Sequence, residues 1–245
     1  MKITLALALL LALPAWAAIT CIGTAKQGRN SGFNPGPGLG ALVPSMAQGD
    51  VIVVSGGHPY REGASLGPIT AGYVEIASSN ASGAAQGVWY KIVGETPDDT
   101  IICYGTGNAD DAGVYVAHVL RGVDTSHVAD TIATTATGSS TNPDPAAIVT
   151  VTDSAWVVVC GGSIVGDNNP GTITNYTNGV YIGASDVNSY SAAACTRQIA
   201  SAGSEDPGAW NSWATGVWRV YTVAIRPATG GAPATGGGEF LPFIR

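Results

Sequence analysis

The sequence predicts an all-β protein, an antiparallel two-sheet β-sandwich with about ten strands and a jelly-roll-like outline. Three observations predict this class. Short β-rich runs alternate with Gly, Pro, Asn and Asp along the chain after residue 17. No window has a convincing helical period. Apolar residues make up 45% of the chain and 34 of the 245 residues are Gly, so the chain can bury a core and form many turns.

Ten runs are expected to form strands. The run from Trp156 to Cys160 is apolar at every position, as is typical of a central strand covered on both faces, and the run from Val114 resembles it. The most helix-like stretch, Ser191 to Ala200, alternates polar and apolar residues, which favours a strand. The expected strands are Ile19 to Thr24, Val51 to Ser55, Tyr73 to Ala77, Val88 to Val93, Thr100 to Tyr104, Val114 to Val123, Ile148 to Thr152, Ala155 to Gly161, Tyr190 to Ile199 and Val217 to Arg226.

One domain is expected over residues 18–227, with no internal repeat. Residues 228–238 read as a flexible Gly-rich linker, and residues 239–245 form an apolar C-terminal peptide. Two of the three phenylalanines of the chain fall in this peptide, which we interpret as an assembly peptide. The alternative is that the tail folds back on its own sandwich or stays disordered. The apolar residues of the peptide are Phe240, Leu241, Phe243 and Ile244.

Residues 1–17 resemble a secretory signal. Lys2 supplies a positive charge, an apolar run follows that is too short to span a bilayer, and Ala15-Trp16-Ala17 matches a cleavage site. The mature chain would then begin at Ala18 and have no membrane span. An uncleaved apolar segment buried against a partner is the alternative.

Charge restricts the possible partners. Only 11% of the residues are charged, against about 25% in a typical protein, and the formal net charge is −7. Nucleic-acid binding needs clustered Lys and Arg, so it is not expected, and the acidic balance disfavours anionic membranes and polysaccharides. A surface poor in charge is typical of an exported or particle-surface β protein.

The four cysteines permit two disulfides in an exported protein, and the sequence does not separate the three possible pairings. None forms a C-x-x-C pair, so zinc and redox chemistry have no support. Buried free thiols are the alternative. The candidate disulfide cysteines are Cys21, Cys103, Cys160 and Cys195.

The patterns typical of catalysis are better explained as turns. Residues 63–67 match the G-x-S-x-G nucleophile pattern around Ser65, but no strand leads into it and Pro68 follows instead of a helix. The possible histidine partners of this serine would be His58, His118 and His127. Residues 105–107 (Gly-Thr-Gly) lack the third glycine and the helix of a dinucleotide loop. No catalytic residue and no cofactor is expected.

Metal binding is not expected either. The three histidines lack zinc-ligand spacing. The oxygen-rich turns at residues 108–111 and 167–169 could hold calcium, but they lack the ligand alternation of an EF-hand loop, and Asn and Asp are ordinary turn residues.

Trp210 and Trp213 are the candidate glycan contacts. They flank Asn211 in a Gly- and Pro-rich loop, and exposed tryptophans beside an amide would suit stacking on a sugar ring. The alternative, which we prefer, is that both rings cap one end of the core.

Four segments in order resemble a β-sandwich family of virion-associated proteins in tailed phages and prophages. Residues 47–54 (AQGDVIVV), 87–93 (GVWYKIV), 120–124 (LRGVD) and 218–227 (WRVYTVAIRP) are similar to strand motifs of that family. The resemblance implies a tail, fibre or capsid-decorating protein and carries over no catalytic residue.

The sequence therefore favours a non-enzymatic structural or attachment protein displayed on a virion or cell surface, bound to copies of itself or to other structural proteins. A secreted carbohydrate-binding module that contacts a surface glycan is the alternative. A hydrolase that uses Ser65 has the least support.

Overall fold

The computed structural model describes residues 18–27, 34–59, 65–81, 83–104, 113–164, 169–183, 190–211, 213 and 215–229. Within these residues a single turn of 3-10 helix, η1 (Val43–Ser45), is the one helical element, and strands make up most of the rest. The predicted all-β sandwich of two antiparallel sheets is confirmed. The signal-like segment 1–17, residues 230–238 of the linker and the peptide 239–245 lie outside the described residues.

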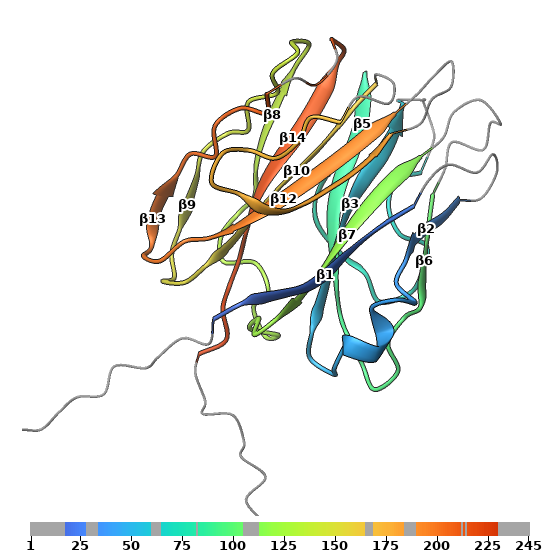
Figure 1. The fold of residues 1–245 in the computed structure, drawn as a ribbon, viewed down its shortest axis with the longest axis vertical. Coiled ribbons are helices and arrows are strands. Elements are labelled where there is room, and N and C mark those ends of the chain that lie inside the picture. The colour runs from blue at the N-terminus through green and yellow to red at the C-terminus, as the bar shows by residue number, and fades with distance from the viewer. Residues whose placement is uncertain are drawn as a thin grey trace, which may run out of the picture.

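The first half of the chain builds one five-stranded sheet (Figure 1). Its strands, in spatial order, are β1 (Thr20–Gln27), β7 (Val114–Arg121), β3 (Val51–Pro59), β5 (Ala84–Ile92) and β4 (Val74–Ser79). The other two strands of this half pair with each other in a separate ribbon. They are β2 (Asn34–Gly38) and β6 (Thr100–Cys103).

The second half builds the second five-stranded sheet. Its strands, in spatial order, are β11 (Thr177–Gly183), β12 (Ser191–Gln198), β10 (Trp156–Ser163), β14 (Trp218–Ile225) and β8 (Thr134–Gly138). Its separate ribbon pairs β9 (Ile148–Thr150) with β13 (Gly203–Glu205). Each half thus completes its own sheet, whereas a jelly roll passes its strands between the two sheets, so this connectivity differs from the jelly-roll-like outline.

The strand order of the first half recurs in the second. If β1 to β7 are replaced in turn by β8 to β14, the order β1-β7-β3-β5-β4 becomes β8-β14-β10-β12-β11, which is the order of the second sheet. The ribbon β2-β6 likewise becomes β9-β13. The expectation of no internal repeat is therefore wrong at the level of strand order. We refer to β1–β7 as repeat one and to β8–β14 as repeat two.

The registers and irregularities of the two repeats also correspond. Along the central strands, VIVVSGG at residues 51–57 takes the place of WVVVCGG at residues 156–162. A bulge interrupts β4 between Glu75 and Ala77, and β11 has its register shift at the corresponding place, between Thr177 and Val180. A bulge shared at one position is a specific feature of the backbone, which supports a true structural repeat.

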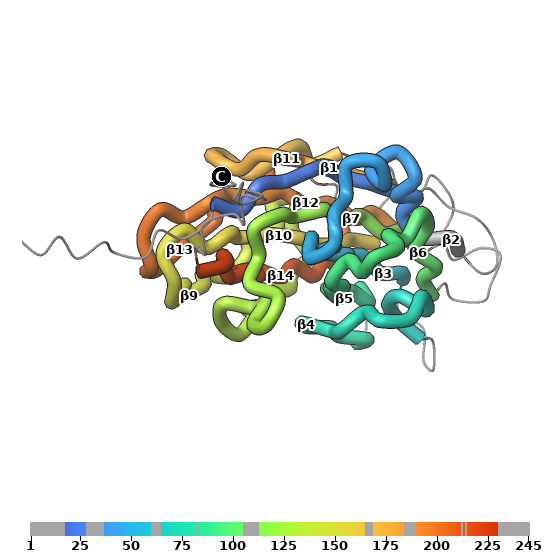
Figure 2. Tube along the Cα trace, turned by 90° about the horizontal axis from the view of Figure 1, so that it is seen from below, coloured from blue at the N-terminus to red at the C-terminus, as the bar shows by residue number. Residues whose placement is uncertain are grey.

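The two sheets face each other in opposite order. β3 faces β10 at the centre, β7 faces β12 and β5 faces β14, while β1 lies beside β11 at one edge (Figure 2). Exchanging the repeats reproduces the three central neighbours, while the contact of β1 with β11 has no equal between β8 and β4. An approximate two-fold axis therefore passes between β3 and β10, and the sandwich resembles a symmetric dimer built within one chain.

Apolar side chains fill three layers. The central layer lies between the sheets, and alternate residues of each central strand point into it, such as Val53 of β3 and Val158 of β10. The intervening residues point outward, Val54 into the outer layer of repeat one and Val159 into the outer layer of repeat two. Residues of the β2–β6 and β9–β13 ribbons, for example Ile101 and Ile148, cover these outer layers. The expectation that both faces of a central strand are covered is confirmed.

All ten expected runs form strands, and four further strands were not expected. The additional strands β2, β8, β11 and β13 are rich in Gly, Thr, Asn, Ser or Pro, so neither an apolar run nor an alternation marks them. β8 and β11 are edge strands, where few positions need to be apolar. In the part of the chain that the structure describes, no helix is both long and apolar enough to cross a membrane.

Candidate functional site

Two clefts open at the two edges of the sandwich where a strand of repeat one meets a strand of repeat two. The first, the polar cleft, lies between β1 and β11 and has a volume of about 350 Å³. The second, the apolar cleft, lies between β4 and the segment that leads into β8, with a volume of about 460 Å³. Since β8 corresponds to β1 and β4 to β11, the approximate two-fold axis relates the clefts.

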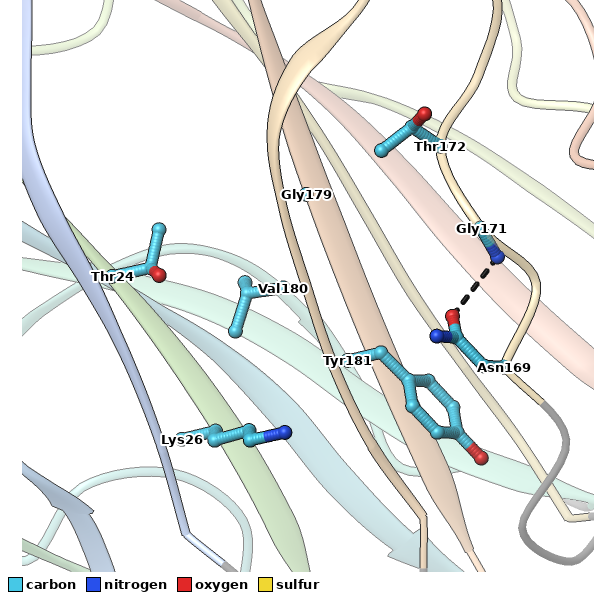
Figure 3. Close-up of a pocket in the computed structure, with 8 residues that line it drawn as sticks. All are labelled: Thr24, Lys26, Asn169, Gly171, Thr172, Gly179, Val180 and Tyr181. Atoms are coloured by element: carbon cyan, nitrogen blue, oxygen red, sulfur yellow. Dashed lines mark hydrogen bonds between the residues drawn. The ribbon is translucent and has the colours of Figure 1, made fainter.

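The polar cleft presents hydrogen-bonding groups from β1 and from the segment before β11 (Figure 3). Lys26 is exposed, and its side chain extends towards the β11 side. The amide oxygen of Asn169 accepts a hydrogen bond from the backbone N–H of Gly171 at 2.9 Å, which closes the turn on that side. The cleft is lined by Thr24, Lys26, Asn169, Gly171, Thr172, Gly179, Val180 and Tyr181.

The apolar cleft presents hydrophobic side chains to solvent. Ile132 is 89% exposed and Val74 is 49% exposed, which is unusual for side chains of this size. The remaining lining is mostly apolar, apart from Glu75 and Thr131. The cleft is lined by Val74, Glu75, Ile76, Tyr90, Ala129, Thr131, Ile132 and Ala133.

Asp130 holds the segment that carries Ile132. Its buried carboxylate accepts hydrogen bonds from the backbone N–H of Val151 at 2.7 Å and from the hydroxyl of Thr152 at 2.6 Å. Its own N–H donates to the carbonyl oxygen of Ala224 at 2.8 Å. These bonds fix the backbone before Ile132, and the pairing of Thr134 with Thr222 fixes it after Ile132, so Ile132 is exposed on a held backbone. No sequence pattern marks this site, because residues 129–133 contain no apolar run.

The candidate glycan residues lie in different environments. Trp210 is fully buried and Trp213 is 1% exposed, and both belong to the outer apolar layer of repeat two. The two rings meet edge to face with centroids 5.4 Å apart, and the Trp213 indole N–H donates to the Ser191 hydroxyl at 2.8 Å. Asn211 between them is exposed. The rings cap the core, as the preferred alternative has it, and neither offers a face to a sugar.

The four cysteines are free thiols, so the structure supports no disulfide between them. Cys160 and Cys195 lie on neighbouring strands, but Cys160 points into the central layer and Cys195 into the outer layer, so their side chains diverge. Cys103 belongs to the outer layer of repeat one, and Cys21 packs against the central layer. Burial raises the pKa of each thiol, to about 12 for Cys160 and Cys195. All four behave as small apolar residues.

The Ser65 pattern is not assembled for catalysis. Nε2 of His58 lies 3.1 Å from the backbone carbonyl oxygen of Ser65, so the ring contacts the main chain and not the hydroxyl. Gly67 has a φ of +102° and lies against the Trp89 ring, where an added Cβ would come within 2.6 Å of ring atoms. These glycine requirements are those of a turn. Gly63 and Ala64, and the oxygen-rich and Gly-Thr-Gly turns at residues 105–111, lie outside the described residues.

His118 is a buried core residue. Its Nε2 lies 2.8 Å from the carbonyl oxygen of Asn178, which can only accept, so Nε2 carries the proton. Burial lowers the pKa of His118 to about 4. The ring is therefore neutral near pH 7, and it joins β7 of repeat one to β11 of repeat two.

A cluster of Asp124, Ser126 and His127 was not predicted from the sequence. The Ser126 hydroxyl donates to Asp124 at 2.6 Å, and this hydrogen bond is the main reason that the pKa of Asp124 is lowered. The hydroxyl proton points at the carboxylate, so His127, 3.0 Å from the same oxygen, does not receive it. The cluster caps an exposed turn and does not form a nucleophile-base pair. Among the described residues, no three His, Cys, Asp or Glu side chains gather in a way that could hold a metal ion.

Comparison with protein-family models, with curated proteins and with solved structures gave no match for this chain.

Proposed function

We propose that this protein is a non-enzymatic structural or attachment component displayed on a virion or cell surface, where it binds copies of itself or other structural proteins. The observation that carries the proposal is the exposure of apolar side chains on defined strands and edges. Ile132 is 89% exposed and Val74 is 49% exposed, and both line the apolar cleft. Exposed apolar groups that gather beside one cleft are typical of a surface that another chain covers.

The C-terminal peptide supplies a complementary surface. Phe240, Leu241, Phe243 and Ile244 would each gain about 1.5–3 kcal/mol on burial. A linker rich in Gly separates them from the sandwich and gives them reach. The peptide therefore supports a role in assembly.

The location follows from the sequence features. The low charge, the signal-like residues 1–17 and the four segments that resemble virion-associated sandwich proteins all support display on a surface. Display on a virion and display on a cell share one requirement, a stable scaffold that holds its binding surfaces outward. A sandwich with three apolar layers meets it.

The test is to place charge in the peptide of the full chain. The double substitution Phe240→Asp and Phe243→Asp removes two aromatic side chains and adds two carboxylates. We expect the mass measured by light scattering to fall towards that of a single chain, because burying an unpaired carboxylate costs several kcal/mol.

A matched variant carries the same charge elsewhere. Ala232→Asp with Thr235→Asp adds two carboxylates within the linker and leaves the peptide intact. Its mass should equal that of the unchanged chain. If both double variants assemble alike, or if the unchanged chain never exceeds one copy, the proposed role in self-assembly is wrong.

Trp210 and Trp213 are not placed to bind a glycan. A sugar stacks on an exposed aromatic face, and both rings are buried.

A further inference from the structure

We propose that the apolar cleft between β4 and residues 129–133 is the docking site for the C-terminal peptide, Glu239–Arg245, of a second copy of this chain. The inference rests on the proposed function, since it names the surface through which one copy would bind the next. Four features of the described residues carry it: the lining of the cleft, its open strand edges, its contrast with the polar cleft, and the direction in which the chain leaves the sandwich.

The lining of the cleft matches the composition of the peptide. Val74, Ile76 and Ile132 provide aliphatic surface and Tyr90 provides an aromatic ring, which suits the two phenylalanines and two aliphatic residues of the peptide. Glu75 is the acidic residue of the lining, and the peptide carries one residue of each charge, Glu239 and Arg245, so the match rests on the apolar residues. The volume of about 460 Å³ lies within the range of pockets that bind small ligands.

Both strands beside the cleft have an open edge. β4 is the last strand of its sheet and pairs with β5 alone, and β8 is the last strand of the other sheet and pairs with β14 alone, within the residues that the structure describes. An extended peptide can add to such an edge through main-chain hydrogen bonds. Pro242 lacks an N–H, but a proline is tolerated on an edge strand when its position faces away from the ladder.

The polar cleft serves as an internal comparison. The approximate two-fold axis relates the two clefts, and Thr24 and Ala133 occupy corresponding positions in them. The polar cleft nevertheless presents Lys26 and Asn169, while the apolar cleft presents Ile132. The clefts lie at corresponding edges and differ in volume and chemistry, so an apolar peptide would select the cleft beside β4.

The chain leaves the sandwich close to the cleft but runs away from it. Ile225 forms a bridge with Ala129, which lines the cleft, and Pro227 then forms a bridge with Val123. The strand thus proceeds from the cleft towards the end of the molecule, where the two ends of the described chain lie near each other (Figure 1). This direction favours binding of the peptide in the cleft of a neighbouring copy rather than in the cleft of its own chain.

The linker is long enough for this exchange. Nine residues, 230–238, separate Thr229 from the peptide, and a Gly-rich chain of that length has a root-mean-square span of roughly 15–18 Å. Since each copy has one peptide and one cleft, two copies can fill each other's clefts. Such a pair is closed and two-fold symmetric.

The experiment uses the full chain with Phe243 replaced by the photo-crosslinking residue p-benzoylphenylalanine. Irradiation is carried out at a concentration at which light scattering detects assembly, and crosslinked peptides are mapped by mass spectrometry. We expect a crosslinked dimer whose attachment points fall within residues 74–76 or 129–133. Ile132→Asp should lower the dimer yield by about tenfold, since one buried aliphatic side chain accounts for roughly that factor in affinity.

Val149→Asp is the matched control, because Val149 is also exposed, at 61%, but lies on β9 outside the cleft. Its dimer yield should be unchanged. Crosslinks that map to other residues, crosslinks confined to a single chain, or no crosslink at all would overturn the inference. Assembly that still depends on Phe240 and Phe243 while the crosslinks fall elsewhere would leave the proposed function standing and remove only this docking site.

Discussion

At the scale of single residues, His118 connects the two repeats through one hydrogen bond. The ring is buried in β7, and its Nε2–H donates to the carbonyl oxygen of Asn178 in β11. The corresponding residue of repeat two is Val223, since Val53 pairs with His118 and Val158 pairs with Val223. The fold therefore accepts an apolar side chain at this position, and His118 adds a titratable group to the core.

His118 makes the stability depend on pH. Its pKa is about 4 in the folded chain and 6.5 as an unperturbed group, so the unfolded chain binds a proton that the folded chain does not bind between these values. The contribution of the neutral His118 ring to the free energy of unfolding is complete above pH 6.5. It falls as the pH is lowered towards 4 and does not change further below that pH. The loss should be about 3 kcal/mol at most.

The measurement is denaturant unfolding from pH 7.5 to pH 4, for the unchanged chain and for His118→Val. The variant should lack the histidine-dependent part of the pH slope, because the carboxylates are the same in both chains. It should lose about 1 kcal/mol at pH 7.5 with the hydrogen bond. Parallel slopes for the two chains would show that His118 does not titrate as described.

Trp213 is buried and Asn211 is exposed, although both belong to one loop. Trp213→Ala should lower the free energy of unfolding by about 3–5 kcal/mol, because it removes a buried ring and its contact with Trp210. Asn211→Ala, two residues away and exposed, should change it by less than about 0.5 kcal/mol. Thermal unfolding measures both. A stable Trp213→Ala protein would mean that the ring is not part of the core.

At the scale of elements, the glycine pairs of the two central strands explain how neighbouring strands fit against them. An added Cβ at Gly57 would collide with the carbonyl group of Ala85 in β5, and one at Gly162 would collide with Tyr190 and Gln86. Both glycines are at the same place in their repeats. The backbone beside Gly57 cannot move without disturbing the ladder, and the side chains beside Gly162 are buried and hydrogen-bonded to each other, so both positions exclude larger residues.

Gly57→Ala is therefore expected to destabilise the protein by about 2 kcal/mol or more, as overpacking beside a fixed backbone does. Gly94→Ala is the matched control, because Gly94 is exposed and an added Cβ there meets nothing within 4 Å. It should be close to neutral. Chemical denaturation of the two variants provides the comparison, and equal midpoints would contradict the packing described for β3.

The elements that the sequence predicted are those that packing makes apolar. Central strands such as β3 and β10 are buried on both faces, and their composition shows it. The edge strands β8 and β11 and the short strands β2 and β13 are specified by their neighbours rather than by their own residues. A strand that buries one face or less can consist of Thr, Gly and Asn. Such a strand has no apolar run or alternation from which it could be predicted.

At the scale of the whole molecule, the repeat went unnoticed because it is carried by pairing rather than by sequence. The two halves share a recognisable pattern at VIVVSGG and WVVVCGG, and elsewhere their side chains differ. Strand order, register and the shared bulge show the relation. The candidate site was hidden for the same reason, because the apolar cleft joins residues 74–76 to residues 129–133, and only the packing of the two repeats brings them together.

The repeat also bears on assembly. The two sheets already pack against each other within one chain, so their inner faces are buried in the central layer. The proposed association between chains uses the outer edges and the C-terminal peptide instead. A reciprocal exchange of peptides between two copies would saturate at a dimer and would not grow into fibres.

Sedimentation equilibrium of the full chain over a wide range of concentrations tests this most directly. The account predicts that the average mass rises from that of one copy, 24.6 kDa with residues 1–17 present, to that of two copies and then stays constant. The chain with Phe240→Asp and Phe243→Asp should remain at the mass of one copy throughout. A full chain that is monomeric at every concentration, or one whose mass grows without limit, would contradict it.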